Sequence, residues 1–185
     1  MKSLVKISLA IFAAAVVGWL AFGFFGVQAL FLDREVNEEI PQSVSQLISG
    51  PATDSNDSPG NGAGPELVGK GAFQQGDSTY TISGDAFLSR IEGQLTLTFR
   101  DFEVSNGPDL FVYAVKTAST DNKTVKDTVA NEDFVNLGAL KGNIGNQSYP
   151  LEADLNPEEY QVIAIWCRRF SRNFGSVSLA ASPDA

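Results

Sequence analysis

The hydrophobic positions of this chain fall into two regions with different patterns. The first, 7–32, is a nearly continuous apolar run without a charged side chain. In the second, which begins near residue 66, apolar and polar residues alternate, as in Leu95, Leu97 and Phe99 with threonines between them. A run of about 20 apolar residues is typical of a membrane-spanning helix, whereas strict alternation indicates strands with one buried face.

The alternating region predicts an all-β domain. Its runs are rich in β-branched and aromatic residues, and Gly, Asn and Asp separate them, as expected for strands and turns. Short strands at this spacing favour an antiparallel β-sandwich of jelly-roll-like form. We expect a helical turn at Asn156-Pro157-Glu158-Glu159. The predicted strands are 67–73, 78–84, 86–93, 94–104, 109–117, 134–139, 147–151, 160–167 and 175–180.

The apolar run determines the predicted domain organisation. Lys2 and Lys6 precede it and acidic residues follow it, so we expect a transmembrane signal anchor with the N-terminus in the cytoplasm and the domain outside, in the periplasm or extracellular space. A cleaved signal peptide is the alternative, because small residues suited to cleavage occur at Val27-Gln28-Ala29. The run is longer than the usual apolar core of a signal peptide, which favours the anchor.

The segment between the anchor and the domain predicts a linker. Residues 33–49 are acidic and weakly amphipathic, which is compatible with a short juxtamembrane helix, and 50–65 consist almost entirely of small and polar residues. We therefore expect a flexible leash of roughly 30 residues. The predicted divisions are 1–6 (cytoplasmic N-terminus), 7–32 (anchor), 33–65 (juxtamembrane segment and Gly/Pro/Ser-rich linker), 66–181 (β-sandwich domain) and 182–185 (tail).

Composition excludes several classes of function. The chain has 185 residues and a formal net charge of −9, which argues against a nucleic-acid partner. It has no histidine, so a Ser-His-Asp or Cys-His relay is not available, and hydrolytic nucleophilic catalysis is not expected. The single cysteine excludes an intramolecular disulfide and a Cys-rich zinc site, and we predict no metal site.

The single cysteine, Cys167, has two interpretations. It ends an apolar run whose two faces are both hydrophobic, which predicts a central strand with the cysteine packed as a small apolar residue. Alternatively, it is a reactive thiol. Arg169 would share its strand face and Arg172 follows closely, and a guanidinium at that range lowers the pKa of a thiol. Exposure of the sulfur distinguishes the two.

Four stretches together resemble one known family. They occur in the family's order and span most of 66–181: "GKGAF" (69–73), "FEVSNGPDLFVYAV" (102–115), "LGALKGNIGNQSYPL" (137–151) and "VIAIWCRRFSRNFGSVSL" (162–179). The chain is similar to the DM-thirteen family, described as an electron-transfer domain. The resemblance implies an extracytoplasmic β-sandwich in which Cys167 carries redox chemistry, as a bare thiol or as a ligand to a group such as haem.

The sequence narrows what the resemblance implies. With no histidine and Met1 as the sole methionine, a haem with His or Met ligands is not possible from one chain, whereas a Cys167-ligated haem stays open and no cofactor is required. A bare thiol has no resolving cysteine, so its disulfide partner must be a small thiol or another redox protein.

The competing prediction is a binding or adhesion module. In it Cys167 is structural and the domain recognises a cell-surface ligand such as a glycan, a wall polymer or a protein. Phe87, Tyr113 and Tyr149 are candidates for its surface, although aromatic residues of a sandwich more often belong to the core.

Overall fold

The structure is a computed structural model that describes residues 2–20, 32–49, 64–152 and 154–179. The helices are α1 (Lys2–Trp19), α2 (Gln42–Ser49) and α3 (Asn122–Ala130). The strands are β1 (Glu66–Ala72), β2 (Gln74–Gln75), β3 (Ile82–Ile91), β4 (Gln94–Val104), β5 (Leu110–Val115), β6 (Phe134–Ala139), β7 (Gln147–Pro150), β8 (Val162–Cys167) and β9 (Arg172–Ser178).

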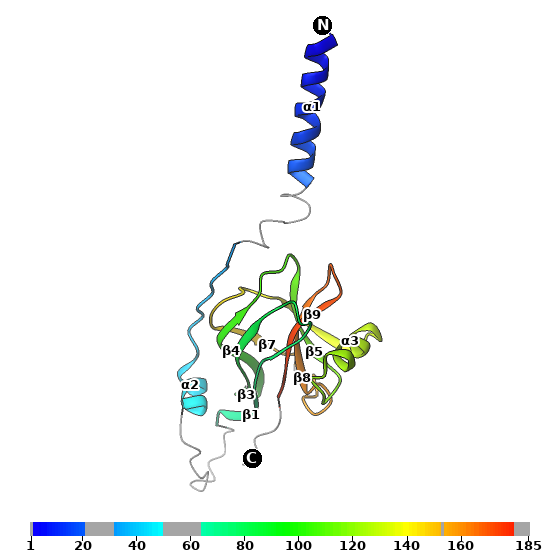
Figure 1. Ribbon diagram of the computed structural model, residues 1–185. Helices are drawn as coiled ribbons and strands as arrows, with labels where there is room; N and C mark the ends of the chain where they lie inside the picture. Colours follow the sequence, from blue (N-terminus) through cyan, green and yellow to red (C-terminus); the bar gives the residue numbers. More distant parts are fainter. Residues whose placement is uncertain (1, 21–31, 50–63, 153, 180–185) are drawn as a thin grey trace.

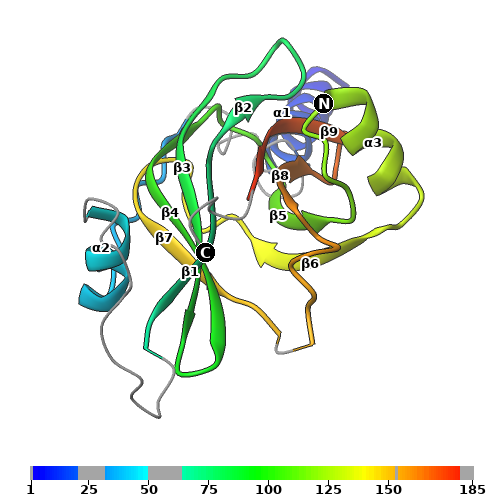
Figure 2. The same ribbon diagram turned by 90° about the horizontal axis from the view of Figure 1, so that it is seen from below.

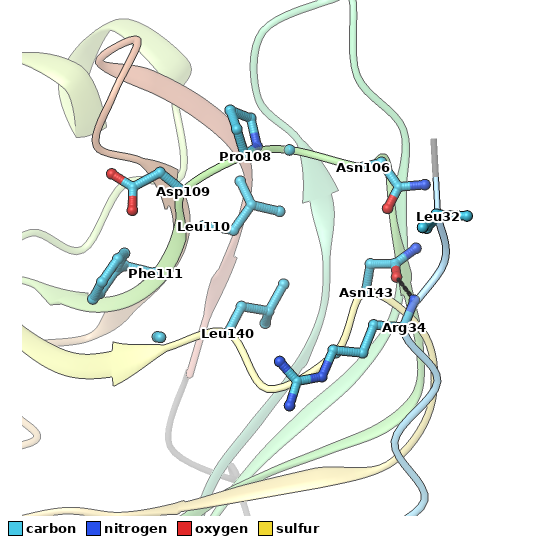
Figure 3. Close-up of a pocket in the computed structure, with 12 residues that line it drawn as sticks. Leu32, Arg34, Asn106, Pro108, Asp109, Leu110, Phe111, Leu140 and Asn143 are labelled. Atoms are coloured by element: carbon cyan, nitrogen blue, oxygen red, sulfur yellow. Dashed lines mark hydrogen bonds between the residues drawn. The ribbon is translucent and has the colours of Figure 1, made fainter. Parts of the chain in front are cut away.

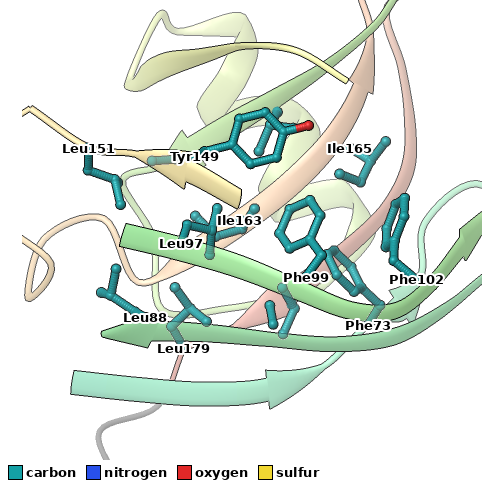
Figure 4. Close-up of a cluster of buried hydrophobic side chains, with 14 of the residues drawn as sticks. Phe73, Leu88, Leu97, Phe99, Phe102, Tyr149, Leu151, Ile163, Ile165 and Leu179 are labelled. Atoms are coloured by element: carbon teal, nitrogen blue, oxygen red, sulfur yellow. The ribbon is translucent and has the colours of Figure 1, made fainter. Parts of the chain in front are cut away.

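The strands form two antiparallel sheets that pack face to face (Figure 1). One sheet has the order β1-β3-β4-β7 and the other has the order β2-β9-β8-β5-β6. Side chains from both sheets fill the space between them, with Leu97 and Phe99 of β4 opposite Ile163 and Ile165 of β8 (Figure 4). The predicted antiparallel β-sandwich is therefore confirmed.

Strand β8 is central, as its apolar faces predict. It lies between β5 and β9, and all six of its residues are buried. One face lies in the main core, and the other packs against α3 through Val125 and Val129. A strand buried on both faces needs apolar residues at every position, which is why this segment shows no alternation.

A glycine accounts for one error in the predicted strands. The sequence predicted separate strands at 78–84 and 86–93, but β3 is continuous and pairs with β4 on both sides of Gly84. The register shifts between Ser83 and Asp85, and Gly84 has a φ of +105°. A Cβ atom here would lie 2.7 Å from the Cα of Phe102. Gly84 is thus a β-bulge and not the end of a strand.

Helix α3 was not predicted. It follows Asp121, whose carboxylate accepts a hydrogen bond of 2.9 Å from the backbone N–H of Thr124 and so caps the helix. Val125 and Val129 are four residues apart and therefore share one face, which covers the outer side of the five-stranded sheet (Figure 1). The expected helical turn after Asn156 is present, because the Glu159 and Tyr160 N–H groups donate to the Asn156 carbonyl.

The predicted anchor falls on α1 and on residues 21–31, which lie outside the described residues. Among the described residues, no helix is long and apolar enough to cross a membrane. The predicted transmembrane segment is therefore not confirmed.

The first half of the predicted flexible leash, residues 33–49, packs against the domain. Residues 33–49, here called the N-terminal strap, lie along the sandwich (Figures 1 and 2). The Val36 and Glu38 N–H groups donate to the Ile144 and Asn146 carbonyls, each at 2.9 Å, and Val44 of α2 is fully buried. Burial of apolar side chains and pairing of backbone groups hold the strap. Residues 50–63 lie outside the described part.

Candidate functional site around Cys167

Cys167 is the last residue of β8 and is completely buried. Its Cα partners are Leu110 on β5 and Arg172 on β9. The side chain has 0% exposure and belongs to the main core cluster, together with Ile165 and Phe174. The sulfur of this structure has no contact with solvent, as the interpretation of Cys167 as a packed residue expects. The reactive-thiol interpretation therefore requires local opening of this strand end.

The surroundings of the sulfur act on its pKa in opposite directions. Burial raises the pKa of the Cys167 thiol and is the largest effect. The backbone N–H groups of Phe170, Arg169 and Asp109 act to lower the pKa of the thiol, whereas the Asp109 charge raises it. The pKa of the thiol is raised overall, so the thiol is protonated at neutral pH.

Arg169 does not continue the strand. The predicted shared face required an extended chain beyond Cys167, but β8 ends at Cys167 and residues 168–171 form a turn. Ser171 closes that turn in the left-handed region with a φ of +49°, and its N–H donates to the Arg168 carbonyl at 3.4 Å. The effect of Arg169 on the thiol therefore comes from its backbone N–H, which lowers the pKa, and the sequence did not predict this.

Arg172 pairs with a carboxylate that the sequence analysis missed. Its guanidinium lies 3.8 Å from Asp77, which also accepts hydrogen bonds from Lys126 at 3.0 Å and Asn122 at 2.9 Å. Burial raises the pKa of Asp77, but these hydrogen bonds and positive charges outweigh it and leave the pKa lowered. The Arg172 guanidinium, which the sequence predicted to act on the thiol, therefore interacts with Asp77.

A second ion pair borders the site directly. The Arg168 guanidinium lies 3.4 Å from the Asp109 carboxylate and 3.5 Å from the centroid of the Phe111 ring. Arg168 thus connects the end of β8 to the start of β5. The sequence predicted Arg169 as the arginine that acts on the thiol. Arg168 contacts Asp109 only because β5 pairs with β8 in the folded chain.

Two hollows lie near this end of the sandwich. The first is a cavity of about 300 Å³ at the start of β5, which Figure 3 shows. The second is a groove of about 670 Å³ between α3 and the turn at 168–171. Its floor includes Tyr113, Phe134 and Trp166, with the Tyr113 and Phe134 rings stacked at 4.2 Å. Its charged rim consists of Lys126, Asp127, Glu132 and Arg168.

A cysteine-ligated haem does not fit this arrangement. The sulfur is buried within the core, and neither of the two hollows is lined by Cys167. A ligand in either one would have to displace packed side chains to reach the sulfur. The residues present therefore favour the bare thiol.

The three aromatic candidates are mainly core residues. Phe87, Tyr113 and Tyr149 are 4%, 3% and 3% exposed. Burial raises the pKa of Tyr149, whose hydroxyl donates to Gln147 at 2.8 Å inside the sandwich. Tyr113 differs from the other two because it lines the groove beside α3.

The fold and the site define a β-sandwich domain with a single buried cysteine at the end of its central strand. Residues 72–179, more than half of the chain, match the family model described as Electron transfer DM13, and the chain belongs to this family. The resemblance drawn from the four sequence stretches is thereby confirmed. No curated protein and no solved structure matches the chain.

Proposed function

We propose that this protein has a redox function of the electron-transfer type and that the Cys167 thiol is its redox group. The family description supports the redox role. The observation that carries the assignment to Cys167 is its place at the end of β8, where the backbone N–H groups of Phe170, Arg169 and Asp109 act to lower the pKa of the thiol. Backbone N–H donors favour the thiolate over the thiol.

The proposed chemistry is exchange with a low-molecular-weight disulfide. The Cys167 sulfur attacks one sulfur of R–S–S–R, so the Cys167–S–S–R bond forms and the original S–S bond breaks. The thiol proton passes to the leaving thiolate, giving R–SH; Cys167 is oxidised and the leaving sulfur is reduced. A second R–SH reverses the step and returns two electrons. Because the sulfur is buried, local opening must precede attack.

The location of this function remains the expectation from sequence. The apolar run 7–32, with lysines before it and acidic residues after it, supports a membrane-anchored protein whose domain lies outside the cytoplasm. Direct tuning of the thiol by the Arg169 and Arg172 guanidinium groups also stays a prediction. The contact between Arg172 and Asp77 weakens the case for Arg172.

The test measures reaction of the full chain with glutathione disulfide under native conditions. Intact mass spectrometry should show one added glutathione, formed through local opening and removed by excess thiol, and none in Cys167→Ala. The rate should exceed the rate of global unfolding measured in the same buffer. A reaction that occurs only as fast as global unfolding would rule out the redox assignment and leave Cys167 as a packing residue.

The groove beside α3 supports a second candidate function, a binding module for a cell-surface polysaccharide. Its aromatic floor and its rim of both charges offer apolar contact and hydrogen bonds to a polar ligand. Sedimentation with insoluble cellulose, chitin or peptidoglycan tests this candidate. Glu132→Gln should weaken retention, and Glu92→Gln, in the exposed turn between β3 and β4, should not. Absence of retention on all three polymers contradicts it.

A further inference from the structure

The first cavity is lined by an arginine that no carboxylate of the described residues pairs with. Arg34 of the strap lines the cavity, and among the described residues its guanidinium forms no ion pair or hydrogen bond. By contrast, Arg90, Arg100, Arg168 and Arg172 are each paired with a carboxylate. A guanidinium at the edge of a hollow recognises carboxylates through two parallel hydrogen bonds. Arg34 is exposed, so its guanidinium is accessible to an anion that enters the cavity.

The rest of the cavity has one apolar side, and Asn106, Asp109 and Asn143 add polar groups to its lining. Figure 3 shows Leu110, Phe111 and Leu140 on the side away from the strap, with the Arg34 side chain extending beneath Leu140. Leu32 and Pro108 add further apolar surface. A ligand bound here would have to bring an apolar body as well as a negative group. A hydrated inorganic ion would leave that surface uncovered, so the lining selects an amphipathic molecule.

Hydrogen bonds fix the backbone that carries Arg34. Asp33 accepts from the side-chain amides of Asn106 at 2.8 Å and Asn143 at 2.9 Å, and the Arg34 N–H donates to Asn143 at 2.6 Å. The Asn143 side chain, only 7% exposed, forms part of the cavity wall. The position of the strap at this cavity is therefore determined by side chains of the sandwich, so the site exists before a ligand binds.

We propose that this cavity binds a small amphipathic carboxylate. The carboxylate pairs with the Arg34 guanidinium, and the apolar part packs between Leu110 and Leu140. A volume of about 300 Å³ is at the lower end for ligand sites and suits a molecule of about a dozen non-hydrogen atoms. The site depends on the strap, which lies outside the region matched by the family model, and it does not involve Cys167.

The test uses 4-phenylbutanoate as the probe and its neutral analogue 4-phenylbutanamide as the control. Titration of the full chain, followed by methyl NMR, should move the Leu110 and Leu140 signals and leave those of Leu88, in the core of β3, unchanged. The amide should bind roughly 10- to 100-fold more weakly, because it lacks the charge-assisted hydrogen bonds.

Variants of Arg34 separate charge from shape. Arg34→Gln should lose the preference for the carboxylate over the amide, and Arg34→Lys should keep part of it. Arg90→Gln is the control and should keep all of the preference, because Arg90 lies on β3 and pairs with Glu66. The thermal midpoint of Arg34→Gln should equal that of the parent, because the guanidinium pairs with no side chain in the described part of the protein. Equal binding of acid and amide, unchanged affinity in Arg34→Gln, or shifts confined to signals outside the cavity would each overturn the proposal.

Discussion

Arg168 and Asp109 join the two segments that surround the buried sulfur. Their side chains approach to 3.4 Å, and the Arg168 N–H donates to the Asp109 carbonyl at 3.1 Å. The pair therefore connects the end of β8 to the residue before β5 by both side chain and backbone. Because the charge of Asp109 raises the pKa of the Cys167 thiol, this contact also links the surface ion pair to the buried sulfur.

Asp109→Asn should lower the pKa of the Cys167 thiol. The substitution removes the negative charge that disfavours the thiolate and keeps the backbone N–H that favours it. Arg168→Gln should shift the pKa in the opposite direction, because it leaves the Asp109 charge uncompensated. A pH titration of the Cys167 Cβ chemical shift measures both. The loss of stability should be small, about 0–1 kcal/mol, since the pair is partly exposed. Equal titration curves for all three proteins would contradict the linkage.

Cys167→Ser and Cys167→Ala should differ little in stability. A serine hydroxyl in an apolar core without a partner costs about 1–3 kcal/mol. Here the serine oxygen can accept hydrogen bonds from the same N–H groups that surround the sulfur, so the serine variant should be no less stable than the alanine variant. Urea unfolding at pH 7 gives both free energies. If Cys167→Ser is clearly less stable than Cys167→Ala, the backbone N–H groups do not form hydrogen bonds with the side chain at position 167.

Asp77 should make stability depend on acid pH. Its pKa is lowered from the ordinary value of 3.8, so its contribution is present above that value and is lost as the pH falls through the native pKa. Asp77→Asn should therefore cost about 1–3 kcal/mol at neutral pH and much less in acid. Urea unfolding across this pH range measures the difference. Asp101→Asn is the control, because the Asp101 side chain is 85% exposed. A difference that is constant with pH would contradict the prediction.

Disruption of α2 should release the strap without unfolding the sandwich. Val44 is fully buried, so Val44→Asp places a charge in an apolar contact, whereas Val44→Ala only removes volume. The Ile144 N–H donates to the Arg34 carbonyl and the Ser148 N–H to the Glu38 side chain. Hydrogen exchange at Ile144 and Ser148 should rise strongly in Val44→Asp and less in Val44→Ala. Unchanged protection in the aspartate variant would mean that α2 does not hold the strap.

The sandwich was predictable because its signal is local. Alternation in β4 reports a strand with one buried face, and the uniform apolar run of β8 reports a strand buried on both. Both properties follow from the direction of successive side chains, which the residue order sets directly. Gly84 was misread, and α3 was not predicted, because both depend on contacts with other parts of the fold. A glycine between strand segments is compatible with a turn or a bulge, and pairing with β4 decides between them.

The candidate site could not be predicted to the same extent, because its contacts join distant residues. Residue order alone showed one cysteine, two candidate arginines nearby and no histidine, which limited the redox chemistry to Cys167, as a bare thiol or as a haem ligand. The end of β8 at Cys167 then turned Arg169 away from the strand, and Asp77 attracted Arg172. The pKa of the Cys167 thiol depends on burial and on the N–H and the charge of Asp109. The packing of β5 against β8 brings these effects together at the sulfur. Electrostatic and desolvation effects act through space, so only the folded chain reveals them.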